Sequence, residues 1–266
     1  MHDIQIGARH HQMPSSWDEL TTAQLEFLAR TMAMPSVTME QVKLYMALFC
    51  LDAYVRAEEG SNVVRIDSSS YEIEAGNMLA VQELFGYLFE DDKPIVRSEL
   101  HENPYPTLRI KGHELKGDDD RLYTITFEQY IYLLTYLDAV SKDHGQLCRC
   151  LACVWHRGQE FDIDNLERDA DLIGRLDDDV KQVMFWYVQG SLDALQQRFA
   201  RVFSGPSSLK AGNVLDAQLR LLDALADGDM TKKDLVRHGM LIDALYTLDE
   251  SVRRKEEMDK KYQNRK

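Results

Sequence analysis

Three of the four cysteines and a histidine lie close together in the segment 147–162, LCRCLACVWHRGQEFD. Cys148, Cys150, Cys153 and His156 are residue types that bind zinc or, as a thiol beside a base, act as a nucleophile. The apolar residues among them have helical spacing, and a helix turns by about 100° per residue. Cys148 and Cys150 would then lie on opposite sides, whereas Cys150–Cys153 and Cys153–His156 are neighbouring pairs that each supply half of a four-ligand site. The spacing favours a buried helical face, with Cys150, Cys153 and His156 as the alternative metal ligands.

A catalytic thiol is the second alternative for this segment. It would need electropositive surroundings and a base, and Arg149 and His156 are close in sequence. The chain has no glycine-rich phosphate loop, Gly-x-Ser-x-Gly elbow, His-Glu-x-x-His motif or Rossmann fingerprint. The aspartate triplets 118–120 and 177–179 lack the spacing of a calcium-binding loop. We therefore predict no catalytic residue, no cofactor and no metal site, and keep a metal- or thiol-dependent enzyme centred on Cys148–His156 as an alternative.

The composition limits the classes of partner. The chain has 266 residues, of which 44% are hydrophobic, and a formal net charge of −14. That charge repels polyanions, so we expect no nucleic acid partner. No apolar run reaches the ~18 residues of a membrane helix, and the N-terminus lacks the apolar core of a secretion signal. We therefore expect no membrane partner. Because the clustered cysteines do not resemble a secreted disulfide framework, we expect a location in the reducing cytoplasm.

Helix-start signals are frequent along the chain. Thr21, Thr38 and Thr126 each precede a glutamine by three residues, which is the arrangement of a capping box. Apolar residues at helical spacing follow each box, and another such stripe runs from Leu235 to Leu248 in a last helix. These patterns predict amphipathic helices with one buried stripe each.

The first half of the chain also carries strand signals. Alternating β-branched residues in 62–74 predict two short strands or a hairpin. A second hairpin is expected between 107–111 and 121–125, with its turn near Gly117. The predicted fold is therefore mainly α, a multi-helix bundle with a small β-hairpin element in the first half.

Four segments follow from these patterns. They are a flexible N-terminal arm (1–16), a helical subdomain with short strands (17–120), a helical domain (121–252) and a charged C-terminal tail (253–266). The tail holds seven basic and three acidic residues, a net charge of +4. It is interpreted as a solvated helix end, with a docking tail for an acidic partner, or for the protein's own acidic body, as the alternative.

Two stretches carry a resemblance to a known group of proteins. The segment 16–25, SWDELTTAQL, resembles the W-[DE]-E-[LV]-T-x-x-Q opening of small acidic helical proteins from tailed-phage morphogenesis clusters, including tail assembly chaperones. The segment 122–130, LYTITFEQY, with the cysteine helix and Trp186-Tyr187 after it, is similar to phage and prophage proteins of the same kind. The resemblance implies a role in virion assembly or structure and no catalytic residues.

The leading hypothesis is a non-enzymatic interaction protein, a phage assembly factor similar to a tail assembly chaperone, whose partner is a virion or tail protein. Exposed apolar helix faces would cover a sticky segment of that partner, and the acidic charge would keep the complex in solution. A minor structural component of the phage particle is the first alternative, and the enzyme centred on Cys148–His156 is the second. The oligomeric state stays open.

Overall fold

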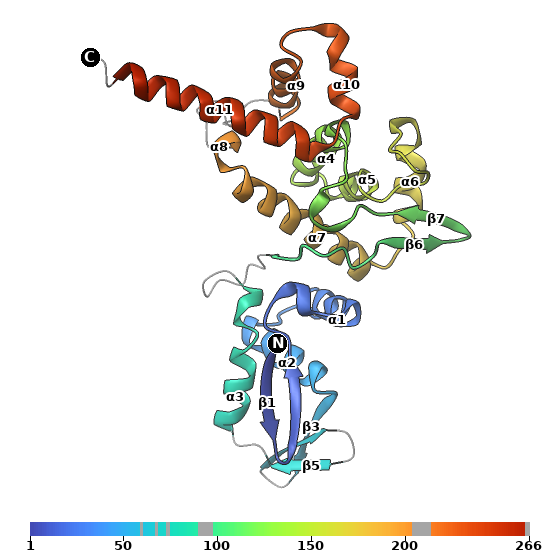
Figure 1. The fold of residues 1–266 in the computed structure, drawn as a ribbon. Helices are drawn as coiled ribbons and strands as arrows, with labels where there is room; N and C mark the ends of the chain where they lie inside the picture. Colours follow the sequence, from blue (N-terminus) through green and yellow to red (C-terminus); the bar gives the residue numbers. More distant parts are fainter. Residues whose placement is uncertain (59–60, 67–68, 73–74, 90–97, 204–213, 264–266) are drawn as a thin grey trace. The chain divides into compact units, whose positions relative to one another are not determined.

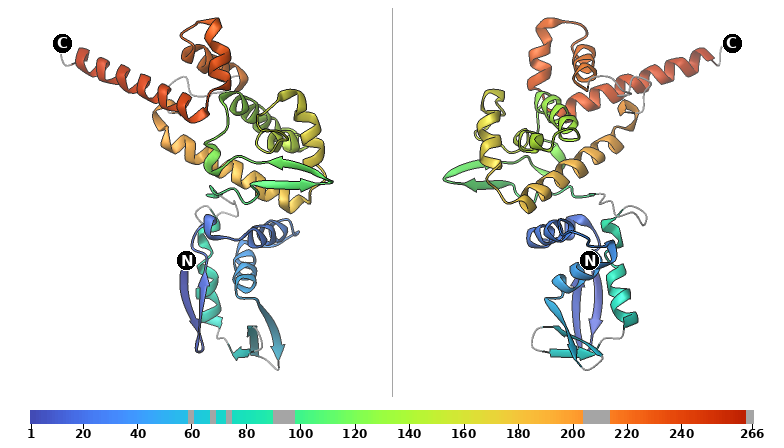
Figure 2. Two further views of the ribbon diagram at one scale, coloured as in Figure 1. Left: turned by 45° about the vertical axis from the view of Figure 1, so that its right-hand side comes forward. Right: turned by 180° about the vertical axis from the view of Figure 1, so that it is seen from behind.

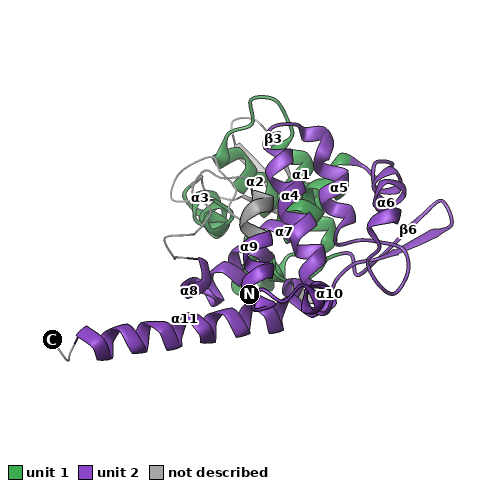
Figure 3. Cartoon of the chain, turned by 90° about the horizontal axis from the view of Figure 1, so that it is seen from above, with its two compact units in different colours: residues 1–104, 178–187 green, residues 105–177, 188–266 purple. Residues whose placement is uncertain are grey.

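The computed structural model describes residues 1–58, 61–66, 69–72, 75–89, 98–203 and 214–263, and its helices confirm a mainly α fold (Figures 1 and 2). Its strands form three small antiparallel sheets among these residues. The chain divides into two compact units, unit 1 with residues 1–104 and 178–187, and unit 2 with residues 105–177 and 188–266 (Figure 3). The expected boundary was at residue 120, whereas residues 105–120 belong to unit 2. Helix α7 (Asp178–Arg198) in addition contributes its first turns to unit 1.

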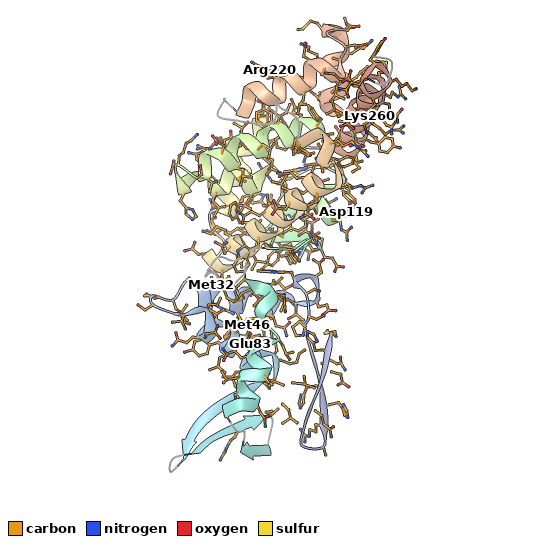
Figure 4. The ribbon with its side chains drawn as sticks, turned by 90° about the vertical axis from the view of Figure 1, so that its left-hand side faces the viewer. Met32, Met46, Glu83, Asp119, Arg220 and Lys260 are labelled. Atoms are coloured by element: carbon orange, nitrogen blue, oxygen red, sulfur yellow. The ribbon has the colours of Figure 1, made fainter. Side chains whose placement is uncertain are left out.

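Unit 1 combines short strands with helices. Its described elements are β1 (His2–Ile6), β2 (Arg9–Met13), η1 (Trp17–Glu19), α1 (Thr22–Met32), α2 (Met39–Cys50), β3 (Ala53–Glu58), β4 (Ser61–Ile66), β5 (Ser69–Glu72), α3 (Ala75–Glu83), η2 (Gly86–Leu88) and the first turns of α7. Trp17 meets Trp186 of α7 edge to face, with ring centroids 5.4 Å apart. Helix α3 contacts α2, where the buried Lys43 ammonium lies 3.6 Å from the Glu83 carboxylate. Figure 4 labels Glu83 on α3. Met46 of α2 is fully buried in this unit.

The first residues form a hairpin where a flexible arm (1–16) is expected. Strands β1 and β2 pair antiparallel, with Ile4 opposite His11 and His2 opposite Met13. The two-residue loop between them begins with Gly7 at φ 62, a conformation that glycine adopts without strain. Met13 is fully buried and anchors the second strand in unit 1. The polar, histidine-rich strand hid the alternation that would have predicted this pair.

The predicted strands in 62–74 are present, in a larger sheet than expected. Strands β4 and β5 pair antiparallel there, although residues 67–68 and 73–74 lie outside the described part. The sheet also contains β3, a strand that was not predicted from the sequence. Helix α2 ends before it because Asp52 has a left-handed φ of 48, which stops helical hydrogen bonding.

Unit 2 is mainly helical. Its described elements are β6 (Thr107–Ile110), β7 (His113–Lys116), η3 (Asp120–Leu122), α4 (Phe127–Val140), η4 (His144–Gln146), α5 (Leu147–Ala152), η5 (Ile163–Asn165), α6 (Leu166–Ile173), the remainder of α7, α8 (Ala200–Phe203), α9 (Val214–Leu225), η6 (Met230–Lys232), α10 (Lys233–His238) and α11 (Leu241–Gln263). Phe127, Leu151 and Trp155 are fully buried, and Trp155 Nε1 donates to the Tyr105 carbonyl at 2.7 Å. This core packs α4 against α5, and the Trp155 bond ties it to the segment just before β6.

The expected pairing of 107–111 with 121–125 is wrong. Strand β6 pairs with β7 instead, through a two-residue loop in which Lys111 and Gly112 both have positive φ, as a type I′ turn requires. Arg121 and Leu122 also have positive φ, which is incompatible with a strand. The chain after them joins the start of the last helix, since the Leu241 amide donates to the Ile125 carbonyl at 2.9 Å.

All three predicted capping boxes are confirmed. The side chains of Thr21, Thr38 and Thr126 each accept a hydrogen bond from the backbone amide three residues on. The side-chain oxygen of the glutamine at that position accepts one from the threonine backbone amide. The expected C-terminal tail begins within α11, which continues unbroken to Gln263. Every side chain of 253–263 is exposed, so this stretch is a solvated helix.

Candidate functional site

The cysteine cluster lies on α5 and just after it, within unit 2. Helix α5 contacts α4 and α6, and the side chains of Cys150 and Cys153 are fully buried, whereas Cys148 is half-buried. Burial raises the pKa of Cys150 to about 12 and raises the pKa of Cys153 well above its ordinary value. Both thiols are therefore protonated at neutral pH, and a thiol is a poor nucleophile compared with a thiolate. Cys153 Sγ instead donates to the Arg149 carbonyl at 3.4 Å.

His156 is oriented by Gln129, the glutamine of the third capping box. Gln129 Oε1 accepts from the Thr126 amide at 2.8 Å, so its Nε2 must point the other way. That Nε2 donates to the Cys153 carbonyl at 3.2 Å and lies 3.3 Å from His156 Nε2. An amide N–H pointing at Nε2 requires a lone pair there, which assigns the proton of a neutral imidazole to Nδ1, facing the Arg157 carbonyl at 3.4 Å.

The ring of His156 is thus a structural acceptor. Burial lowers the pKa of His156, which agrees with a neutral imidazole. Its Nε2 lone pair, which a metal would need, is already directed at the Gln129 amide. Within the ranges that the structure describes, no three His, Cys, Asp or Glu side chains are close enough to hold a metal ion, Cys150, Cys153 and His156 included.

The lowered pKa of His156 makes stability depend on pH. Below the ordinary value of 6.5 the unfolded chain takes up a proton that the folded chain resists, so the free energy of unfolding should fall as the pH drops from 6.5 towards the lowered pKa. In His156→Gln, whose amide oxygen can still accept from Gln129, this part of the pH dependence should disappear. Urea unfolding at several pH values between about 5 and 7.5 measures the difference. Identical pH profiles for the two proteins would contradict the assignment.

A cavity of about 450 Å³ lies in unit 2 beside this histidine. Its wall is mainly polar and includes Lys116, Asp118, Asp119, Glu128, Gln129, His156, Glu160 and His238. Carboxylates outnumber cations there, so the field favours cations over anions. The Thr126 hydroxyl and the Gln129 amide on this wall serve the helix cap, so their hydrogen bonds support structure rather than chemistry.

Exposed apolar side chains concentrate near the end of the chain. Of the twelve large hydrophobic side chains exposed in the described part, seven lie between residues 219 and 262. They are Leu219, Met230, Leu235, Met240, Tyr246, Met258 and Tyr262. Single exposed apolar residues are ordinary, whereas several that lie together on neighbouring elements are typical of an interaction site. Helices α9 and α10 lie side by side, and η6 contacts α10 (Figure 1). We refer to the exposed Leu219, Met230 and Leu235 on these three elements as the α9–α10 surface.

Leu235 corrects a prediction from the sequence. It was assigned to the buried stripe of the last helix, but its side chain is 76% exposed, and Met230 just before it is 73% exposed. The stripe is interrupted because α10 ends at His238 and α11 begins only at Leu241. Leu241, Leu245 and Leu248 alone are buried on the last helix. Helical spacing placed Leu235 on an apolar face but could not show that nothing in unit 2 covers it.

Comparisons with protein-family models, with curated proteins and with solved structures find no match for this chain. In the described part, no helix has both the length and the apolarity that crossing a bilayer requires. The surface chemistry of the chain itself is therefore the basis for a functional proposal.

Proposed function

We propose that this chain is a non-enzymatic interaction protein, an assembly factor of tailed phages similar in role to a tail assembly chaperone. It would bind an apolar segment of a virion or tail protein in the cytoplasm, the host cytoplasm if the gene is phage-borne. The observation that carries the proposal is the α9–α10 surface, where Met230 and Leu235 expose about three quarters of their side chains.

The energetics of this surface fit a protein partner. Complete burial of one Leu or Met side chain contributes roughly 1.5–3 kcal/mol, so two or three such residues supply a useful part of a specific affinity. Burial of apolar surface is not screened by salt. The net charge of −14 opposes nucleic acid and keeps the apolar surface in solution.

The resemblance of 16–25 and 122–130 to phage morphogenesis proteins supports the class of partner that we propose. The segment 16–25 supplies the first capping box and the buried Trp17, so it builds unit 1 rather than a reaction centre. The buried thiols with raised pKa values favour this proposal over a thiol enzyme.

Recovery of the partner tests the proposal. The tagged full chain should capture a virion or tail protein from a phage-infected or prophage-induced lysate, at both low and moderate salt. Leu235→Ser and Met230→Ser should each reduce recovery about tenfold, the equivalent of ~1.4 kcal/mol. Leu79→Ser is the matched control, because Leu79 is 57% exposed but belongs to unit 1.

Three outcomes would contradict the proposal or favour an alternative to it. Equal loss of binding in Leu79→Ser would remove the α9–α10 surface from the proposal. Tight DNA binding that resists salt, with no protein captured, would contradict a protein partner. Retention of the chain in purified particles would favour a minor structural component.

A further inference from the structure

Helix α11 has an inner half that is packed and an outer half that is not. Leu241, Leu245 and Leu248 are buried in unit 2, whereas every side chain of 253–263 is exposed. Figures 1 and 2 show the outer half running out beyond α8, and Figure 4 labels Lys260 on it. A helix of this length without packing is only marginally stable in water, so a packing partner would stabilise it.

The spacing of the buried stripe on the inner half can be extended along the outer half. After Leu245 and Leu248, the spacing of three and four residues leads to Val252, Lys255, Asp259 and Tyr262, which we call the seam. Tyr262 is 68% exposed, and Met258 beside the seam is 57% exposed. These are the a and d positions of a heptad, at which Val252 and Tyr262 offer apolar contacts and Lys255 and Asp259 offer charged ones.

The charges of the outer half select the partner. Arg253, Arg254, Lys260 and Lys261 lie off the seam in this heptad, where they face solvent in a helix pair. Lys255 and Asp259 lie on it and have opposite charges. A second helix with the same two charges in reverse order would match them.

We propose that the outer half of α11 pairs antiparallel with the same segment of a second copy of this chain. With the two-fold axis near Glu257, Lys255 faces Asp259 of the second copy, and Val252 faces its Tyr262, each contact occurring twice. A parallel pair would place Lys255 against Lys255 and Asp259 against Asp259, so like charges exclude it. The pair is isologous and closes as a dimer.

The dimer is a weak one. Eleven helical residues span about 16 Å at ~1.5 Å per residue, so the interface falls at the small end of specific protein contacts. We expect a dissociation constant of roughly micromolar to a hundred micromolar. The α9–α10 surface is not used in this contact, so the inference is independent of the proposed function, and a dimer would carry two copies of that surface.

Sedimentation of the full-length chain from about 5 to 500 µM tests the inference. Wild type should shift from monomer to dimer with concentration. Lys255→Asp and Asp259→Lys should each weaken the dimer about tenfold or more, because each places like charges together at both contacts. An equimolar mixture of these two variants should form a dimer again, since the first then offers only acids and the second only bases.

Matched substitutions off the seam control for charge and helix content. Arg254→Asp changes the charge as Lys255→Asp does, and Tyr246→Ser removes a tyrosine that is 63% exposed and lies off the seam, on the inner half of α11. Both should dimerise like wild type, whereas Tyr262→Ser should not. A wild type that stays monomeric to about 500 µM would overturn the inference. A monomer is also the result expected if an acidic protein, rather than a second copy, covers the seam. Single charge variants that dimerise as well as wild type would also overturn it.

Discussion

Replacing Arg157 by methionine should destabilise the fold by about 3 kcal/mol, because it leaves a buried carboxylate without its cation. The Asp169 side chain is 1% exposed, and its Oδ1 lies 2.5 Å from Arg157 Nε. Its Oδ2 accepts from the Arg157 amide at 3.2 Å, and this bond survives the substitution. This expected loss lies at the lower end of the range for breaking a buried ion pair. Arg157 is 31% exposed, so water screens part of its attraction to Asp169.

Arg168→Met is the matched control, since Arg168 is exposed on the same helix, α6, one residue before Asp169. It should change the free energy of unfolding by less than about 0.5 kcal/mol. Replacing both partners, as Arg157→Met with Asp169→Leu, should recover much of the loss, because no buried charge then remains. Urea unfolding of the four proteins measures these differences. A double variant as unstable as Arg157→Met would assign the loss to packing instead of charge.

Gln129→Glu should cost about 2 kcal/mol at neutral pH, although glutamate and glutamine serve a capping box equally well. One carboxylate oxygen can still accept from the Thr126 amide. The other would face the Cys153 carbonyl and the Nε2 lone pair of His156, where Gln129 Nε2 now donates. Because residue 129 is 5% exposed, water cannot relieve the repulsion between these acceptor groups.

Gln24→Glu and Gln41→Glu supply the comparison, because both glutamines occupy the same position in their own capping boxes. The free energy of unfolding of each of these two variants should lie within about 0.5 kcal/mol of the wild-type value. The cost of Gln129→Glu should shrink towards pH 5, since a proton on the new carboxyl or on His156 restores a donor between them. Thermal or urea unfolding at pH 5 and pH 7.5 measures the change. Equal costs for the three substitutions would mean that Gln129 acts as a cap only.

Features that depend on a few neighbouring residues were predicted well. The three Thr-x-x-Gln boxes formed as expected, because the bonding groups of a capping box lie within one turn of the chain. The strands of 62–74 were also predicted, because the alternation of β-branched residues is a pattern of neighbouring positions. The hairpin of β6 and β7 was misplaced, because Lys111-Gly112 is a weaker turn signal than the Asn-Gly or Asp-Gly pairs that usually mark such loops.

The candidate site was accessible from sequence only in part. The residues of the cysteine helix were singled out by type, and helical spacing predicted a buried face, but their raised pKa values follow from packing against α4 and α6. The second role of Gln129 was missed, because its contacts with Cys153 and His156 join residues 24 and 27 positions apart. No local pattern signals a bond across that distance.

The sequence by itself determined a mainly α chain, the starts of its capped helices, an acidic charge and which apolar residues share a helical face. The tertiary structure alone decided which of those faces are covered. Leu235 and Leu245 are the same residue type in the same predicted stripe, yet Leu235 is 76% exposed and Leu245 is fully buried. Helical periodicity groups side chains on one element, whereas burial requires a second element to pack against them, and that contact arises between residues distant in the chain.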